Sequence, residues 1–443
     1  MPTPVLPHAP SLCYHHSEPR LCYLPLGYWW WPDWLVDVLA IPDLRARKKK
    51  KKLPDNEPFE DNSLSPRRPF SRFLEHRPDG MEEKSWEVVL EYCGIGVRQS
   101  IEFYSGIGGM AAALEASGAR FEILKAFDLN IHANSVYEFN YRLKPCTRSI
   151  EHLRVRDLEG KARLWMLSPP CQPFTRAGNQ KDIEDNRTKS FLHLLEILKV
   201  LETPPDFFIM ENVKGFDTSL VREIMLKVLK SRGFNISEFM LQPKQFGIPN
   251  TRLRYYCVAR RLSPFAAIED CKGNTNGILT SIPSKSTRDH IPHPPPIPSL
   301  RDFLGDVLFV PRSRAELEPF LIPKRVLSRC QGYRFDVAGP WSCDTSCFTK
   351  AYGSKHVKGT GPVLLVDEWR NDYKRRDKKE QFRTVKDEED IRFFTPEEAL
   401  ILHGFPANFR FPSHLTSRQA WACIGNSLNA KVVAALLEFA IFH

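Results

Sequence analysis

The sequence predicts an α/β fold built on a mainly parallel sheet. From about residue 98 onward, short apolar runs alternate with segments whose apolar residues have helical spacing, and this alternation is typical of α/β proteins. Each apolar run ends in a glycine-rich or polar motif. Because ligands bind beyond the carboxyl ends of the strands in such sheets, we expect the motifs to gather in one site. With 443 residues, the chain can bury a large core.

The predicted elements follow in order along the chain. The strands are the apolar runs Ile101–Tyr104, Ile123–Phe127, Leu164–Leu167, Phe207–Met210 and Tyr255–Ala259. Apolar spacing of three and four predicts helices over residues 111–117, 190–201 and 219–231. Pro396 suits the first turn of a helix over residues 395–402. A final apolar helix covers residues 429–439.

Composition divides the chain into four parts. Residues 1–97 are proline-rich and show no sustained period of 2 or 3.6, so we expect a low-complexity, disordered N-terminal extension there. Residues 98–261 form the first part of an ordered domain. Residues 262–390 begin with a proline-rich connection and form a small inserted region. Residues 391–443 return to the ordered domain.

Charge and cysteine content indicate an intracellular protein with a polyanionic partner. The net charge is +10, which suits a partner such as nucleic acid. The basic run 45–52 is interpreted as a solvated tail, with a nuclear-localisation or RNA-contact patch as the alternative. Eleven cysteines without regular spacing, and no secretory signal, favour reduced thiols in the cytoplasm or nucleus. Asp33 and Asp37 interrupt the tryptophan-rich stretch 21–41 and argue against a membrane anchor.

A glycine-rich turn and an acidic residue suggest a nucleotide-type site. The string FYSGIGG covers residues 103–109, and its glycines allow positive φ and close approach of a ligand. Asp128 ends the next strand, about where a carboxylate holds a ribose diol in nucleotide sites. Taken singly, close packing explains such glycines, and a helix cap explains Asp128.

Four further motifs carry reactive or anion-binding groups. In SPPCQPF, prolines stiffen the loop around Cys171, whose thiolate would be nucleophilic; an inert buried cysteine is the alternative. Glu211 could hold or deliver a proton, or simply cap a helix. Arg252 and Arg254 alternate onto one face and suit a phosphate or a base carbonyl, unless they line a solvated strand edge. Residues 425–427 (GNS) form a turn or an N-cap before the last helix.

Taken together in this order, FYSGIGG, FDLN, SPPCQPF, ENV, RLR and GNS resemble the cytosine-5 methyltransferase family across residues 101–443. The string CFT at residues 347–349, followed by KAYG, resembles the subfamily that acts on tRNA(Asp). The resemblance implies a Rossmann-like S-adenosylmethionine-dependent methyltransferase fold with a small inserted target-recognition region. It also implies methylation of cytosine 38 in the anticodon loop of tRNA(Asp), by a monomer that requires no metal and binds DNA at most weakly.

The resemblance also assigns roles to residues. Cys171 would add to cytosine C6, Glu211 would contact N3 and the exocyclic amine, and Arg252 and Arg254 would hold the base carbonyl and nearby backbone. The S-adenosylmethionine site would comprise Phe103, Gly106, Gly108, Gly109, Asp128, Pro170, Asn426 and Ser427. The tRNA would contact Cys347, Phe348, Thr349, Lys350 and Tyr352.

Two features depart from the family pattern, and two other functions stay open. The family often has acidic residues where this chain has Arg148 and Arg163, which bears on cofactor affinity. A DNA cytosine-5 methyltransferase would use the same residues. A catalytically silent nucleic-acid-binding homologue would bind cofactor or tRNA without methyl transfer.

Overall fold

The protein is described by a computed structural model that covers residues 98–174, 185–261, 277–283, 295–305, 314–354, 357–366, 382–385 and 390–442. The chain divides into two units at Pro78, and every described residue belongs to the second unit. The N-terminal extension, with its basic run and its tryptophan-rich stretch, lies outside the described residues.

A six-stranded sheet forms the centre of the second unit, with the strand order β2-β1-β3-β4-β6-β5. Strands β1 to β4 pair in parallel, whereas β6 runs antiparallel to both β4 and β5. The strands cover Arg98–Phe103 (β1), Phe121–Phe127 (β2), Leu164–Leu167 (β3), Phe207–Val213 (β4), Asn235–Leu241 (β5) and Arg254–Arg260 (β6). The predicted α/β fold is therefore confirmed, with β5 as an additional strand.

The reversed direction of β6 matters for the site. Because β6 is antiparallel to β4, its amino end lies at the edge where β1 to β4 have their carboxyl ends. The register pairs Arg254 with Val213, the last residue of β4. Residues that precede β6 therefore reach the same edge as the motifs that follow the parallel strands.

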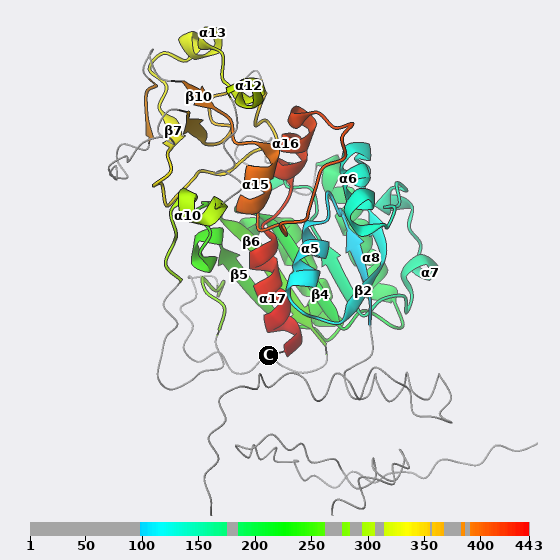
Figure 1. Ribbon diagram of the computed structural model, residues 1–443. Helices are drawn as coiled ribbons and strands as arrows, with labels where there is room; N and C mark the ends of the chain where they lie inside the picture. Colours follow the sequence, from blue (N-terminus) through cyan, green and yellow to red (C-terminus); the bar gives the residue numbers. More distant parts are fainter. Residues whose placement is uncertain are drawn as a thin grey trace, which may run out of the picture. The chain divides into compact units, whose positions relative to one another are not determined.

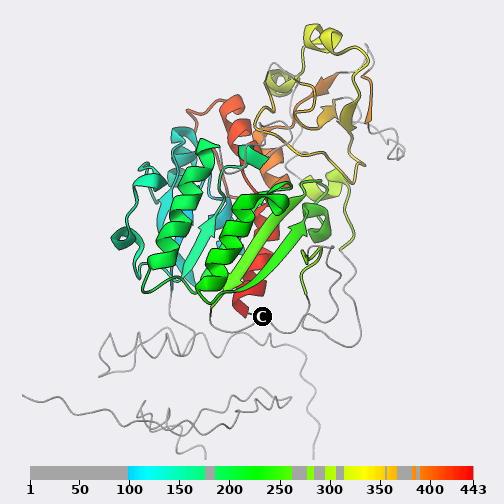
Figure 2. The same cartoon turned by 180° about the vertical axis from the view of Figure 1, so that it is seen from behind.

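Helices cover both faces of this sheet (Figures 1 and 2). Alternate residues of β4 enter two separate cores, Ile209 with α5 and α17, and Met210 with α8 and α9. The helices cover Gly109–Ala116 (α5), Ile131–Tyr141 (α6), Val155–Leu158 (α7), Lys189–Val200 (α8), Leu220–Ser231 (α9), Pro396–Leu402 (α15), Ser417–Asn426 (α16) and Ala430–Phe442 (α17). Single 3-10 turns cover Ile150–His152, Gln172–Phe174, Asn186–Thr188, Phe216–Thr218, Pro243–Phe246, Glu318–Phe320 and Ser328–Cys330.

The inserted region has a small sheet of its own, with the order β10-β8-β7-β9. Its elements are β7 (Phe335–Ala338), β8 (Val363–Leu365), β9 (Phe382–Arg383), β10 (Ile391–Arg392), α10 (Leu300–Leu304), α12 (Arg314–Leu317) and α13 (Lys324–Leu327). Ile391, at which the C-terminal part of the ordered domain is predicted to begin, pairs with Leu365 in this sheet.

The C-terminal segment contains one helix more than predicted. Gly425 and Asn426 belong to the last turn of α16, and only Ser427 follows it, so the turn expected over residues 425–427 is a helix end. The segment Ser417–Phe442 is long and apolar enough to span a membrane, but 61% of its most apolar window is buried. Such burial is typical of core helices, and Figure 1 shows α17 packed along the sheet.

Candidate active site

A cavity of about 500 Å³ opens at the edge of the sheet where β1, β3 and β4 end and β6 begins. This volume is within the range of small-molecule sites. The predicted site residues that line it are Gly106, Asp128, Pro170, Cys171, Glu211, Arg252, Arg254, Asn426 and Ser427. Six segments far apart in the sequence therefore contribute to one cavity.

The glycine turn and Asp128 are joined directly by a hydrogen bond. Gly106 has a φ of 53°, and its amide donates to Oδ2 of Asp128 at 2.8 Å. The amide of Asn130 donates to Oδ1 at 2.7 Å, so both carboxylate oxygens are held by backbone. Burial raises the pKa of Asp128, and these amides oppose the rise. A Cβ on Gly106 would meet no atom within 4 Å, so the turn leaves open space on the cavity side.

Three residues predicted to contact the cofactor do not line the cavity. Phe103 is 0% exposed and stacks on Phe127, with 5.5 Å between the ring centroids. Gly108 caps α5 with a φ of 91°, and a Cβ there would lie 2.3 Å from the ring of Tyr141. A Cβ on Gly109 would lie 2.9 Å from the side chain of Leu428. The structure corrects these three predictions: the residues shape the turn by close packing.

Cys171 lies in a half-buried position after two prolines. The amide of Phe174 donates to its carbonyl oxygen at 3.0 Å, and the Asn212 side chain donates to Pro169 O at 3.3 Å. These contacts hold the loop against β4. Burial raises the pKa of the Cys171 thiol, the nearby Glu211 raises it further, and Arg254 and Arg252 oppose the rise.

Glu211 is buried at 9% exposure and lies within β4, not just beyond it as predicted. Its Oε1 lies 3.3 Å from Nε of Arg254. Burial raises the pKa of Glu211, and both Arg254 and Arg252 act against this rise. The carboxyl group is thus poised to carry a proton inside the cavity.

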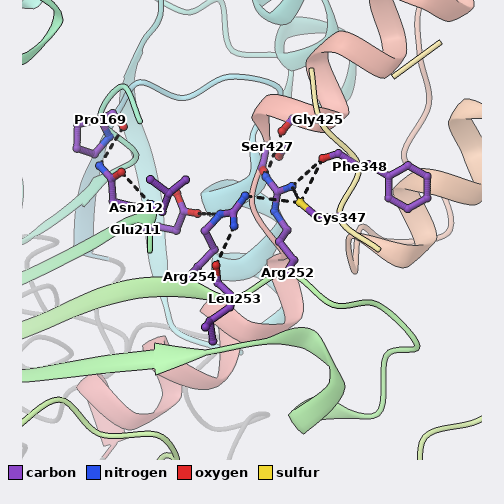
Figure 3. Close-up of polar contacts among 11 residues, drawn as sticks. Pro169, Glu211, Asn212, Arg252, Leu253, Arg254, Cys347, Phe348, Gly425 and Ser427 are labelled. Atoms are coloured by element: carbon purple, nitrogen blue, oxygen red, sulfur yellow. Dashed lines mark hydrogen bonds and ion pairs between the residues drawn. The ribbon is translucent and has the colours of Figure 1, made fainter. Parts of the chain in front are cut away.

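The two predicted arginines differ in their contacts (Figure 3). Arg252 is buried, with 4% exposure. Its Nη1 donates to Phe348 O at 3.1 Å. Its Nη2 donates to Gly425 O at 3.2 Å and to Ser427 O. Arg254 donates to Leu253 O at 2.8 Å and pairs with Glu211. Arg252 therefore fastens the CFT segment to the end of α16, whereas Arg254 faces the carboxyl group.

The CFT segment is partly core. Phe348 and Tyr352 are each 1% exposed, and their ring centroids lie 4.9 Å apart. The Tyr352 hydroxyl donates to Pro362 O at 2.7 Å and accepts from the Phe394 amide at 2.8 Å. The prediction that these two side chains contact tRNA is therefore wrong. Thr349 is half-buried and Lys350 is exposed. A Cβ on Gly425 would lie 2.3 Å from the Thr349 carbonyl carbon, so the segment touches α16.

Several cavity residues were not predicted. Tyr104 lines the cavity, and its hydroxyl donates to Ser190 Oγ at 3.0 Å. Arg187 also lines it, held by Asp185 at 2.8 Å through its Nε. Glu151, in the 3-10 turn after β2 and α6, supplies an acidic group. Tyr104 stands in the FYSGIGG string, and Arg187 stands in the polar string DNRT before a predicted helix, but no pattern marks Glu151.

The two departures from the family pattern lie in different surroundings. Arg148 lines the cavity, but its Nη1 pairs with Asp157 at 3.2 Å. Arg163 pairs with Asp206 and does not line the cavity. Only Arg148 can therefore act on a ligand there.

Comparison with known proteins assigns a family to this geometry. The family model for C-5 cytosine-specific DNA methylase matches residues 98–441. The chain is 37% identical to a DNA (cytosine-5)-methyltransferase of Dictyostelium discoideum, covering 76% of this chain and 93% of the relative. It is 32% identical to the human tRNA (cytosine(38)-C(5))-methyltransferase, covering 76% and 97%. Among solved structures, a mutant of Spodoptera frugiperda DNMT2 matches with a TM-score of 0.61 and 33% identity, covering 78% of this chain and 100% of that one.

Proposed function

Because the chain belongs to the C-5 cytosine-specific DNA methylase family, we propose that it methylates cytosine 38 in the anticodon loop of tRNA(Asp), with S-adenosylmethionine as the methyl donor. The observation that carries the proposal is the convergence of Cys171, Glu211 and Arg254 on the cavity that also contains Asp128. A nucleophile, a proton carrier and a cation meet there beside a nucleotide-type turn.

The residues present suit S-adenosylmethionine, which supplies a methyl group on a sulfonium. Gly106 leaves open space in the turn, and Asp128 offers the remaining lone pairs of a half-buried carboxylate. Phe127 and Ile150 provide an apolar wall, and Glu151 adds an acidic group. Pro170, Asn426 and Ser427 line the cavity as predicted. We expect these residues to hold the cofactor.

Cys171 is the proposed nucleophile. Cytosine C5 is not nucleophilic enough to take a methyl group unaided, so the Cys171 thiolate forms a bond to C6 and makes C5 enamine-like. C5 then takes the methyl group. A base then takes the C5 proton, the C6–S bond breaks with its electron pair on sulfur, and the aromatic base and the Cys171 thiolate are restored.

Glu211 is the proposed proton carrier. Because burial favours its protonated form, it can donate to N3 as the sulfur adds and can regain the proton as the sulfur leaves. Arg254, 3.3 Å away, fixes the orientation of the carboxyl group. It also favours the thiolate of Cys171. Of the two arginines, we expect Arg254 to face the base, because Arg252 is buried and donates to four protein groups.

Two observations support tRNA as the substrate. Relatives from human, mouse, Bos taurus and Schizosaccharomyces pombe are named tRNA (cytosine(38)-C(5))-methyltransferase, and the chain covers 92% or more of each. Lys350 is exposed, and its backbone packs against Gly425 of the cavity lining, so its side chain suits a phosphate near the site. A cytosine must also leave its stack to reach Cys171, which is easier from a loop than from a duplex.

DNA remains the second candidate substrate, because the Dictyostelium discoideum relative at 37% identity is named a DNA methyltransferase. The test is methyl transfer from labelled S-adenosylmethionine to a tRNA(Asp) transcript, to the same transcript with uridine at position 38, and to duplex DNA. We expect label only in the first. Cys171→Ala should abolish it, and the matched Cys343→Ala should not. Transfer to DNA alone would overturn the tRNA assignment, and transfer by Cys171→Ala would overturn the nucleophile.

A further inference from the structure

The sulfur of Cys347 accepts hydrogen bonds from both arginines of the site (Figure 3). Nη1 of Arg252 donates to it at 3.2 Å, and Nη2 of Arg254 at 3.8 Å. The next residue, Phe348, is anchored in the core, so the sulfur has a fixed position. Phe348 O lies 3.5 Å from the sulfur and would accept the proton of a neutral thiol. The two cationic donors favour the thiolate of Cys347, whereas the single carbonyl acceptor favours its neutral thiol.

Among the residues that the structure describes, the charges around this sulfur do not balance without it. Arg252 is a buried cation, Arg254 is a half-buried cation, and Glu211 is the carboxyl group paired with Arg254. Buried charge requires compensation. Tyr256 and His403 also face this cluster and supply none: burial raises the pKa of Tyr256 and lowers the pKa of His403 to about 3, so both are neutral. An ionised Glu211 compensates only one of the two guanidinium groups, and a protonated Glu211 compensates neither. In both states the two cations favour a further anion, which a thiolate at Cys347 supplies.

The two thiols of the site respond oppositely to their surroundings. Burial raises the pKa of Cys171. Burial also acts to raise the pKa of Cys347, but Arg252 and Arg254 outweigh it and lower the pKa overall. The two pKa shifts differ because both guanidinium groups contact the sulfur of Cys347 directly.

We propose that Cys347 is a positioning residue whose thiolate holds Arg252 and Arg254 in the substrate-free enzyme and thereby keeps Cys171 in its neutral thiol form. The inference rests on the proposed function, in which Cys171 is the nucleophile. The two sulfurs compete for the same cations, so an anion at Cys347 disfavours a second anion at Cys171.

The contacts of Arg252 extend this role to the cofactor side. The guanidinium that touches Cys347 also holds Gly425 O and Ser427 O. Ser427 lines the cavity where the cofactor is expected. Removing the sulfur should let Arg252 shift and weaken cofactor binding, whereas a serine, which keeps an acceptor, should preserve it.

The test measures the pH profile of cysteine alkylation in the full chain, followed peptide by peptide with mass spectrometry. In wild type, Cys347 should react with a midpoint below that of Cys171. In Cys347→Ala and Cys347→Ser, the midpoint of Cys171 should move to lower pH, and Cys171 should react about threefold faster or more at pH 7. The midpoint is the primary readout, because nucleophilicity falls as thiol pKa falls.

Matched variants separate charge from packing. Cys343→Ala, in the same segment, should leave the Cys171 midpoint unchanged, because its sulfur contacts Trp341 O and neither arginine. Calorimetry with S-adenosylhomocysteine should show about tenfold weaker binding for Cys347→Ala and near wild-type binding for Cys347→Ser. An unchanged Cys171 midpoint in both folded Cys347 variants would overturn the proposal. Alkylation requires neither tRNA nor methyl transfer. A negative result for Cys347 in this experiment can therefore be distinguished from a failure of the proposed methyltransferase function.

Discussion

Nε of Arg254 lies 3.3 Å from Oε1 of Glu211, and this pair spans the cavity edge between β6 and β4. The contact joins two residues 43 positions apart that belong to antiparallel neighbours in the sheet. It places a proton-carrying group and a cation on the same side of the cavity as Cys171. The pH dependence of the reaction should therefore depend on this pair.

Glu211→Gln should lower kcat by about 10²–10⁴-fold, because it removes the proton given to the base. The proposed chemistry needs a protonated Glu211 and an ionised Cys171, so wild-type kcat should be bell-shaped in pH, with limbs that belong to the coupled pair. Without the carboxyl group, the residual rate should only rise with pH as the thiol ionises. Single-turnover rates across pH measure both; an alkaline fall that persists in Glu211→Gln would contradict the assigned role.

Asp128→Asn should weaken cofactor binding with little effect on kcat at saturating cofactor. The carboxylate accepts from the amides of Gly106 and Asn130 and is expected to hold the ribose. Hydrogen bonds to a charged group are worth about 1.5–3 kcal/mol, which corresponds to roughly 10- to 100-fold in Kd. Calorimetry with S-adenosylhomocysteine checks the change. Glu211→Gln is the control, because it should lower kcat and leave the Kd of S-adenosylhomocysteine unchanged. An equal change in this Kd for the two variants would contradict the separate roles of Asp128 and Glu211.

Gly108→Ala should destabilise the fold through Tyr141. The residue has a φ of 91°, which costs an alanine about 1–2 kcal/mol, and its Cβ would lie 2.3 Å from the Tyr141 ring. Gly118→Ala is a matched control, because its φ of 68° carries similar strain and no atom lies within 4 Å of the added carbon. Urea denaturation should show the larger loss for Gly108→Ala. Equal losses would mean that the ring moves aside without cost.

The sequence predicted the strands and helices whose signals lie within their own residues. The strands that precede the motifs and the helix that follows Pro396 agree with the structure within a few residues, because each depends on its own periodicity and caps. Strand β5 is not predicted because its residues alternate between buried and half-buried at the edge of the sheet, and its apolar run is only the three residues 239–241. The residues glycine, asparagine and serine at 425–427 favour a turn, whereas packing of Gly425 against Thr349 stabilises the end of helix α16 there.

The site could be predicted as a set of residues but not as a set of contacts. Arg252 and Cys347 are 95 positions apart, and nothing in either motif shows that one touches the other. Phe348 and Tyr352 belong to a motif typical of tRNA methyltransferases, yet their aromatic side chains fill a core that forms only when β8 and α16 assemble. Motif membership therefore indicated a shared place in the molecule and left open which side chains face the substrate.

Lys350→Ala and Tyr352→Phe should separate contact with tRNA from packing. Lys350 is exposed beside the CFT segment, so its loss should weaken tRNA binding and reduce the slope of log affinity against log salt by about 1. Tyr352→Phe removes a buried hydroxyl that bonds Pro362 O and the Phe394 amide, so it should cost about 1–3 kcal/mol of unfolding free energy. The salt slope of the folded Tyr352→Phe variant should be that of wild type.

Fluorescence titrations with tRNA at several salt concentrations, together with urea denaturation, measure both effects. A reduced slope for Tyr352→Phe would mean that the loss of this hydroxyl rearranges the tRNA-binding surface, and an unchanged slope for Lys350→Ala would remove that lysine from it.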